Sequence, residues 1–101
     1  MPEVLDPDAI DTALGALPGW RYDGEALVKR AAVPDDGQDT LERTVGAVAD
    51  ELDHHPLITR EPDALTFRLW THSAGGVTAK DVDLAARIDR VLTGAPPDRD
   101  A

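Results

Sequence analysis

The 101-residue chain contains no cysteine. This absence excludes a disulfide framework, a thiolate nucleophile and a zinc–cysteine site, and it agrees with a reducing compartment such as the cytoplasm. The chain also has no apolar run of membrane-spanning length, and its first six residues lack the basic and apolar segments of a secretory signal. We therefore expect a cytoplasmic protein that does not insert into a membrane.

Basic residues are scarce, since 10 Lys and Arg stand against 20 Asp and Glu, which gives a formal net charge of −10 at pH 7. Such a surplus of negative charge repels phosphate backbones and anionic lipids, so we expect no nucleic-acid or membrane partner. A chain of this length can bury one modest core. We expect a single domain over residues 1–94 and a flexible C-terminal tail over residues 95–101.

Apolar spacing predicts seven elements, because three stretches repeat at helical spacing and the others are short or alternating. The expected elements are a helix from Asp6 to Leu17, strands over 20–22 and 26–33, a helix that begins at an Asp39–Glu42 capping box and ends before Pro56, strands over 57–61 and 65–69, and a helix from Thr78 to Leu92. This α-β-β-α-β-β-α order predicts an α+β domain of two layers. A four-stranded antiparallel sheet would carry all three helices on one face.

The three histidines lie at two joints of this predicted fold. His54 and His55 follow the second helix, and His72 follows the last strand, on the same face as Trp70. They fit a structural role as helix and strand ends, a metal site, or acid/base catalysis in which Asp50 or Asp53 orients an imidazole. The metal interpretation is the weakest, because no histidine pair has the four-residue helical spacing of known metal motifs.

The residues in order resemble the pterin-4a-carbinolamine dehydratase family. The match runs from Asp50 through His54-His55-Pro56 to His72 and Asp81. The whole segment from Thr71 to Ala85 and the position of Trp20 also resemble this family, so that the resemblance covers nearly the entire chain. An ordered combination of this kind is far more specific than a histidine pair alone.

The resemblance implies dehydration of 4a-hydroxytetrahydropterin to quinonoid dihydropterin, with no metal and no organic cofactor. It implies a homodimer or homotetramer, for which the outward Trp70 is a second argument. By position, His54 and His72 would donate protons and His55 would mainly bind the pterin. The residues expected to bind or orient the substrate are Asp50, Asp53, Trp20, Lys80 and Asp81.

The alternative is a catalytically inactive binding or assembly module on the same fold. Ile58 and Pro62, which stand where the family often has aromatic side chains, and the outward Trp70 keep this alternative open. The intact histidines favour the enzyme, and in that case all three should share one cleft.

Overall fold

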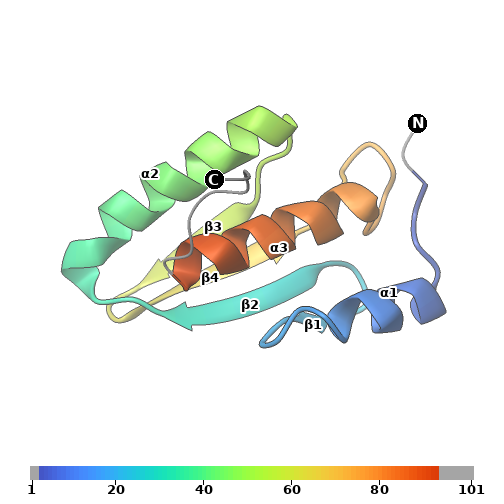
Figure 1. Cartoon of the computed structure of the whole chain (residues 1–101), viewed down its shortest axis with the longest axis horizontal. Helices are drawn as coiled ribbons and strands as arrows, with labels where there is room; N and C mark the ends of the chain where they lie inside the picture. The colour runs from blue at the N-terminus through green and yellow to red at the C-terminus, as the bar shows by residue number, and fades with distance from the viewer. Residues whose placement is uncertain (1–2, 94–101) are drawn as a thin grey trace, which may run out of the picture.

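The computed structural model describes residues 3–93, which form three helices and four strands (Figure 1). In chain order these are α1 (Pro7–Leu14), β1 (Arg21–Tyr22), β2 (Leu27–Ala32), α2 (Asp35–Leu52), β3 (Leu57–Glu61), β4 (Ala64–Leu69) and α3 (Ala79–Leu92). The predicted order is confirmed. The tail expected over residues 95–101 lies outside the described residues. Within residues 3–93 no helix is long and apolar enough to cross a membrane.

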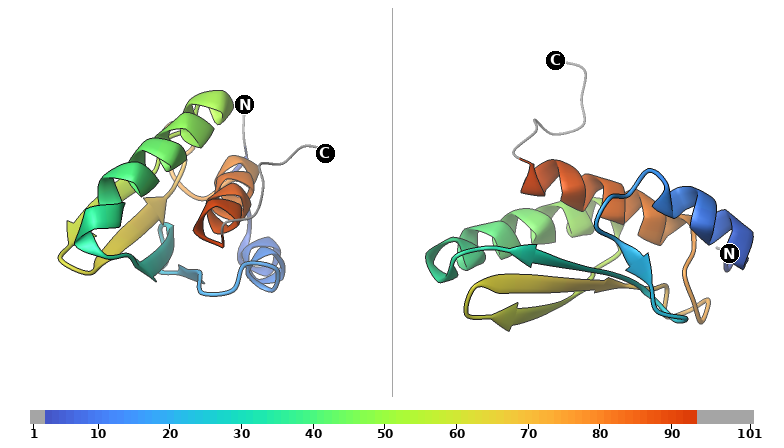
Figure 2. Two further views of the ribbon diagram at one scale, coloured as in Figure 1. Left: turned by 60° about the vertical axis from the view of Figure 1, so that its left-hand side comes forward. Right: turned by 90° about the horizontal axis from the view of Figure 1, so that it is seen from below.

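The four strands form one sheet in the order β1-β2-β4-β3, and every neighbouring pair is antiparallel. All three helices lie on the same side of this sheet, with α2 and α3 next to each other over it (Figure 2). The two-layer α+β architecture expected from the sequence is therefore confirmed.

The core lies between the sheet and the helices, and β4 shows how the sequence builds it. Leu65, Phe67 and Leu69 point toward the helices and are at most 1% exposed. Thr66 and Arg68 alternate with them and face away from the core. This period-two pattern is typical of a half-buried strand. If the same alternation is followed one residue past the end of β4, Trp70 lies on the face of Thr66 and Arg68, away from the core.

Helix α1 begins where the sequence predicts and ends earlier. The Asp6 carboxylate accepts a hydrogen bond from the Ala9 backbone N–H at 2.8 Å, which is the expected N-cap. The helix stops at Leu14 and is followed by turns rather than by a further helical turn to Leu17. Leu17 nevertheless remains buried, because those turns return its side chain to the core.

Helix α2 begins at Asp35, four residues before Asp39. The predicted start at an Asp39–Glu42 capping box is therefore wrong. Asp35 and Asp36 lie in the first turn, where the positive end of the helix dipole favours acidic side chains. Asp39 and Glu42 do not cap the helix; both carboxylates bind the guanidinium of Arg60 on β3. Their spacing therefore serves a contact between helix and sheet.

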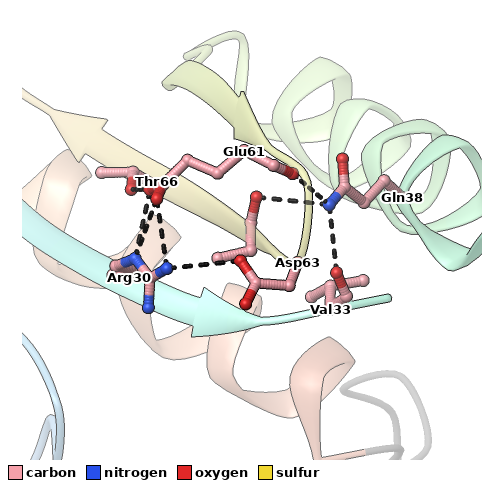
Figure 3. Close-up of polar contacts among 7 residues, drawn as sticks. Arg30, Val33, Gln38, Glu61, Asp63 and Thr66 are labelled. Atoms are coloured by element: carbon pink, nitrogen blue, oxygen red, sulfur yellow. Dashed lines mark hydrogen bonds and ion pairs between the residues drawn. The ribbon is translucent and has the colours of Figure 1, made fainter. Parts of the chain in front are cut away.

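A buried amide explains the early start of α2 (Figure 3). The Gln38 side chain is 1% exposed, and its Nε2 donates to the backbone carbonyls of Val33, Glu61 and Ala64 at 3.0, 2.7 and 3.3 Å. Val33 directly follows β2, and Glu61 and Ala64 flank the β3–β4 turn. One side chain in the first turns of α2 thus satisfies polar groups of two hairpins, which local sequence cannot reveal.

Candidate active site

The turn after α2 positions the first two histidines. Asp53 adopts the left-handed conformation, with φ 53° and ψ 43°, and the His54 backbone N–H donates to the Ala49 carbonyl at 3.0 Å. Together they close the helix in the manner usual for left-handed C-terminal caps, and Asp tolerates this conformation better than most side chains. Pro56 follows and prevents further helix. His54 and His55 therefore project at the entrance to β3.

The loop between β4 and α3 positions the third histidine. It is closed by backbone hydrogen bonds from Thr71 N–H to the Gly76 carbonyl at 2.8 Å and from Gly75 N–H to the Thr71 carbonyl at 2.9 Å. Gly75 has φ 77°, which a glycine adopts without strain. The closed loop presents His72 at its outer side and then delivers the chain into α3, whose N-cap is Thr78 as expected.

A pocket of about 560 Å³ opens between these two segments. It is lined by Asp53, His54, His55, Pro56, Leu57, Trp70, Thr71, His72, Ser73 and Lys80. All three histidines thus line one cleft, together with the predicted substrate-binding residues Asp53 and Lys80.

His54 is held by a buried carboxylate. Its Nε2 lies 2.5 Å from Asp81 Oδ1, and the two side chains are 11% and 0% exposed. The other oxygen of Asp81, Oδ2, accepts from the Thr71 hydroxyl at 2.8 Å and from the Thr78 backbone N–H at 2.9 Å. Because a carboxylate oxygen accepts hydrogen bonds, we assign the hydrogen of this contact to Nε2 of His54, which leaves Nδ1 as the ring nitrogen available to a ligand.

The threonines around Asp81 form an ordered chain of hydroxyls. Thr71 and Thr78 are 4% and 0% exposed, and their Oγ1 atoms are 2.7 Å apart. Since the single hydroxyl proton of Thr71 is given to Asp81, the Thr78 hydroxyl donates to Thr71. Among residues 3–93, every buried side-chain nitrogen and oxygen has a partner. The carboxylate behind His54 is therefore fixed in one orientation.

The other two histidines are more exposed. His55 Nε2 lies 2.9 Å from Asp50 Oδ1, with side chains 60% and 74% exposed. The His72 ring is tilted by 52° against the indole of Trp70, with ring centroids 5.7 Å apart. These imidazoles can adapt to a ligand in a way that His54 cannot.

The structure does not bring every predicted substrate residue to the pocket. Trp20 is 6% exposed in the core, and its Nε1 donates to Asp89 of α3 at 2.8 Å. It is not among the residues that line the pocket, and its packing against α3 accounts for its position. Asp50 and Asp81 do not line the pocket themselves, but each binds an imidazole that does.

Trp70 lines the pocket, a role that its sequence position did not predict. The alternation along β4 predicts that Trp70 lies on the same outward face as His72, where the expected partner is another subunit. Trp70 also lines the pocket, beside Leu57, which is 51% exposed. Within the described residues, no group of three His, Cys, Asp or Glu side chains is arranged to hold a metal ion.

Comparisons with known proteins agree on one family. The sequence model of the family described as pterin 4 alpha carbinolamine dehydratase matches residues 3–91. A provisionally named pterin-4-alpha-carbinolamine dehydratase of Mycolicibacterium smegmatis is 45% identical over 92 residues, which is 89% of this chain and 97% of that protein. One of Sulfolobus acidocaldarius, also provisionally named, is 35% identical over 88 residues, 86% of this chain and 97% of that protein.

A solved structure has the same fold. The crystal structure described as a transcriptional coactivator/pterin dehydratase from Brucella melitensis superposes with a TM-score of 0.83 at 28% identity. The match covers 89% of this chain and 99% of that one. From the family match over residues 3–91 and the identity to these relatives, the chain belongs to the pterin 4 alpha carbinolamine dehydratase family.

Proposed function

We propose that this protein dehydrates 4a-hydroxytetrahydropterin to quinonoid dihydropterin. The observation that carries the proposal is a single pocket in a member of this family that gathers three imidazoles, one of them bound to a fully buried carboxylate. Metal and organic cofactors have no part in the proposed reaction.

The reaction needs one proton transfer to the leaving oxygen and one proton transfer from the ring nitrogen. The carbon that bears the hydroxyl group also bears a ring nitrogen, whose lone pair forms a C=N bond as the C–O bond breaks. Hydroxide is a poor leaving group at neutral pH, so the oxygen takes a proton and leaves as water. The cation that remains then loses its N–H proton to give the quinonoid product. A positioned general acid contributes roughly 10²–10⁴-fold to such a step.

His54 and His72 are the proposed acids. A protonated His54 carries a hydrogen on each ring nitrogen, and the Asp81 carboxylate at 2.5 Å offsets its positive charge. Nδ1 then holds the proton that is transferred, and the same nitrogen can accept one afterwards. His72 comes from the facing loop, so the two donors reach the substrate from different segments.

The remaining lining residues are proposed to bind the pterin. His55 is 60% exposed and can turn toward the polar edge of the ring, while Asp50 limits its orientation. Asp53 and Lys80 offer an acceptor and a cation to the same edge. Trp70 is the aromatic side chain of the pocket, and an indole can stack on a flat bicyclic ring.

A binding or assembly module is the second candidate. The Brucella melitensis structure is described as both a transcriptional coactivator and a pterin dehydratase, so that one fold is associated with two roles. In that case the pocket would still bind a pterin without accelerating its dehydration.

We also propose a homodimer or homotetramer that works in the cytoplasm without nucleic acid. Support comes from the open edge of β3, where backbone groups are available to another strand, and from Leu57, which is 51% exposed at its start. The absence of cysteine supports the cytoplasmic location, and the net charge of −10 supports the lack of a nucleic-acid partner. Sedimentation that gives only monomer at high micromolar concentration contradicts the oligomer.

The decisive experiment follows quinonoid dihydropterin formation from chemically generated 4a-hydroxytetrahydropterin. We expect the protein to accelerate the reaction far above the rate in buffer at neutral and mildly alkaline pH, where spontaneous acid catalysis is weak. If the folded protein gives no acceleration, the dehydratase proposal is wrong and the binding module takes its place.

A further inference from the structure

A second pocket of about 370 Å³ adjoins the first. Glu25, Arg68, Trp70, His72 and Gly75 line it. Trp70 and His72 line both pockets, so their tilted rings form the wall between the two. A ligand ring that lies against this wall in the first pocket has one edge next to the second.

The far side of the second pocket is built by the β1–β2 turn. Arg68 on β4 binds the carboxylates of Asp23 and Glu25, and its guanidinium carbon lies 5.8 Å from the ring centroid of Trp70. Residues more than 40 positions apart in the sequence thus meet beside the wall, since the β1–β2 turn and the end of β4 lie at the same end of the sheet.

The charge of Arg68 is more than balanced. The pKa of Asp23 is held below its ordinary value, first by the backbone N–H of Ala26 and then by that of Glu25 and by Arg68 itself, against the opposing effect of burial. Asp23 is therefore ionised at neutral pH. With Glu25 it places two carboxylates around one guanidinium.

This balance selects among ligands. A phosphate or carboxylate group would meet no uncompensated cation there, and the overall charge of −10 adds to the repulsion. A hydroxyl group can donate to a carboxylate and accept from a guanidinium, so a neutral, hydroxylated chain suits the lining.

We propose that the second pocket is the subsite for the substituent at carbon 6 of the pterin, and that it accepts neutral hydroxylated substituents in preference to anionic ones. The inference rests on the proposed function, since it assumes that the pterin ring occupies the first pocket. Reduced pterins differ in this substituent, so the inference extends the proposed function to substrate selectivity. It assigns that selectivity to Glu25, Arg68 and Trp70.

The test compares three 7,8-dihydropterins by titration calorimetry. Their substituents at carbon 6 are a methyl group, a neutral trihydroxypropyl chain and the triphosphate ester of that same chain. For the unaltered protein we expect the trihydroxypropyl compound to bind most tightly and its triphosphate ester most weakly. The measurement that tests the proposal is the ratio of the affinities for the trihydroxypropyl compound and its triphosphate ester, because these two compounds share the same carbon skeleton.

Charge variants then locate the effect. Glu25→Gln should shift that ratio toward the triphosphate by about 2- to 5-fold at low salt, the range of a partly exposed charge pair, and Glu25→Lys should shift it further. Glu42→Gln is the matched control, because Glu42 also binds an arginine but on β3, outside both pockets. It should leave the ratio unchanged.

The outcomes separate this inference from the function on which it rests. Failure of all three compounds to bind, with no dehydration of the 6-methyl substrate, overturns both. Normal dehydration of the 6-methyl substrate, combined with equal affinities or with ratios that Glu25→Lys does not move, overturns the subsite alone. Tighter binding of the triphosphate to the unaltered protein also overturns it.

Discussion

His54 and His55 are neighbours in the chain, and each binds an aspartate through Nε2, but their surroundings differ sharply. The His54–Asp81 pair is 11% and 0% exposed, at 2.5 Å, and Asp81 is held by two further donors. The His55–Asp50 pair is 60% and 74% exposed, at 2.9 Å. The same two residue types therefore make a fixed imidazole and an adaptable one.

The contribution of each histidine–aspartate pair to stability depends on its exposure to solvent. An exposed ion pair is worth about 0–1 kcal/mol, because water and salt screen it and two side chains must be ordered. In a buried network each hydrogen bond is stronger, and an unpaired member is costly. The comparison predicts that changes around His54 affect both chemistry and stability, whereas changes around His55 affect binding alone.

The largest expected effect tests the two proposed donors together. His54→Ala/His72→Ala should lower kcat by roughly 10²–10⁴-fold, because no general acid remains. Either single variant should keep partial activity when the substrate is a mixture of stereoisomers, since the other histidine still serves one face. His55→Ala should raise KM with a smaller change in kcat. A folded double variant that works at the unaltered rate would refute the acid role.

The next effect separates the two aspartates. Asp81→Asn should lower kcat by about 10- to 100-fold and destabilise the fold by about 2–4 kcal/mol, because the buried network loses its charge and one of its two acceptor oxygens becomes an amide NH2 that faces another donor. Asp50→Asn should change unfolding by no more than about 0.5 kcal/mol, as surface substitutions do. Urea unfolding and steady-state kinetics measure both. Equal effects of the two substitutions would mean that burial does not distinguish the pairs.

Thr71 allows the network to be weakened without touching an ionised group. Thr71→Val keeps the shape and removes the donor to Asp81 Oδ2, so we expect a loss of about 1–3 kcal/mol in unfolding free energy and a smaller loss of activity. Thr44→Val is the control, since the Thr44 hydroxyl bonds an exposed carbonyl within α2. Thermal unfolding that is equally unaffected in both variants would show that the threonine does not hold the carboxylate.

The sequence allowed the element order to be predicted because the information is local. Period-two and helical spacings, the caps at Asp6 and Thr78, and the proline after the histidines each act within a few residues. The common cleft of the histidines also follows locally, because the hairpin of β3 and β4 brings its two ends together.

The features that sequence reasoning missed depend on distant contacts. α2 begins early because Gln38 reaches carbonyls up to 26 residues away. Trp20 is held in the core by a hydrogen bond to Asp89, which lies 69 residues further along the chain. The second pocket exists because Arg68 meets a turn more than 40 residues earlier. No local pattern encodes these pairings, so only the folded sheet reveals them.

The smallest expected effect concerns the turn that directly precedes the two histidines. Asp53 is the single described non-glycine residue with positive φ, and it lies directly before His54. Asp53→Val should cost about 1–3 kcal/mol of unfolding free energy, because a β-branched side chain is strained in the left-handed region, while Asp53→Asn should change it by only a few tenths. Asp53 also lines the pocket, so stability rather than activity is the measurement. If valine is tolerated as well as asparagine, the left-handed turn is not what directs His54 inward and leaves His55 exposed.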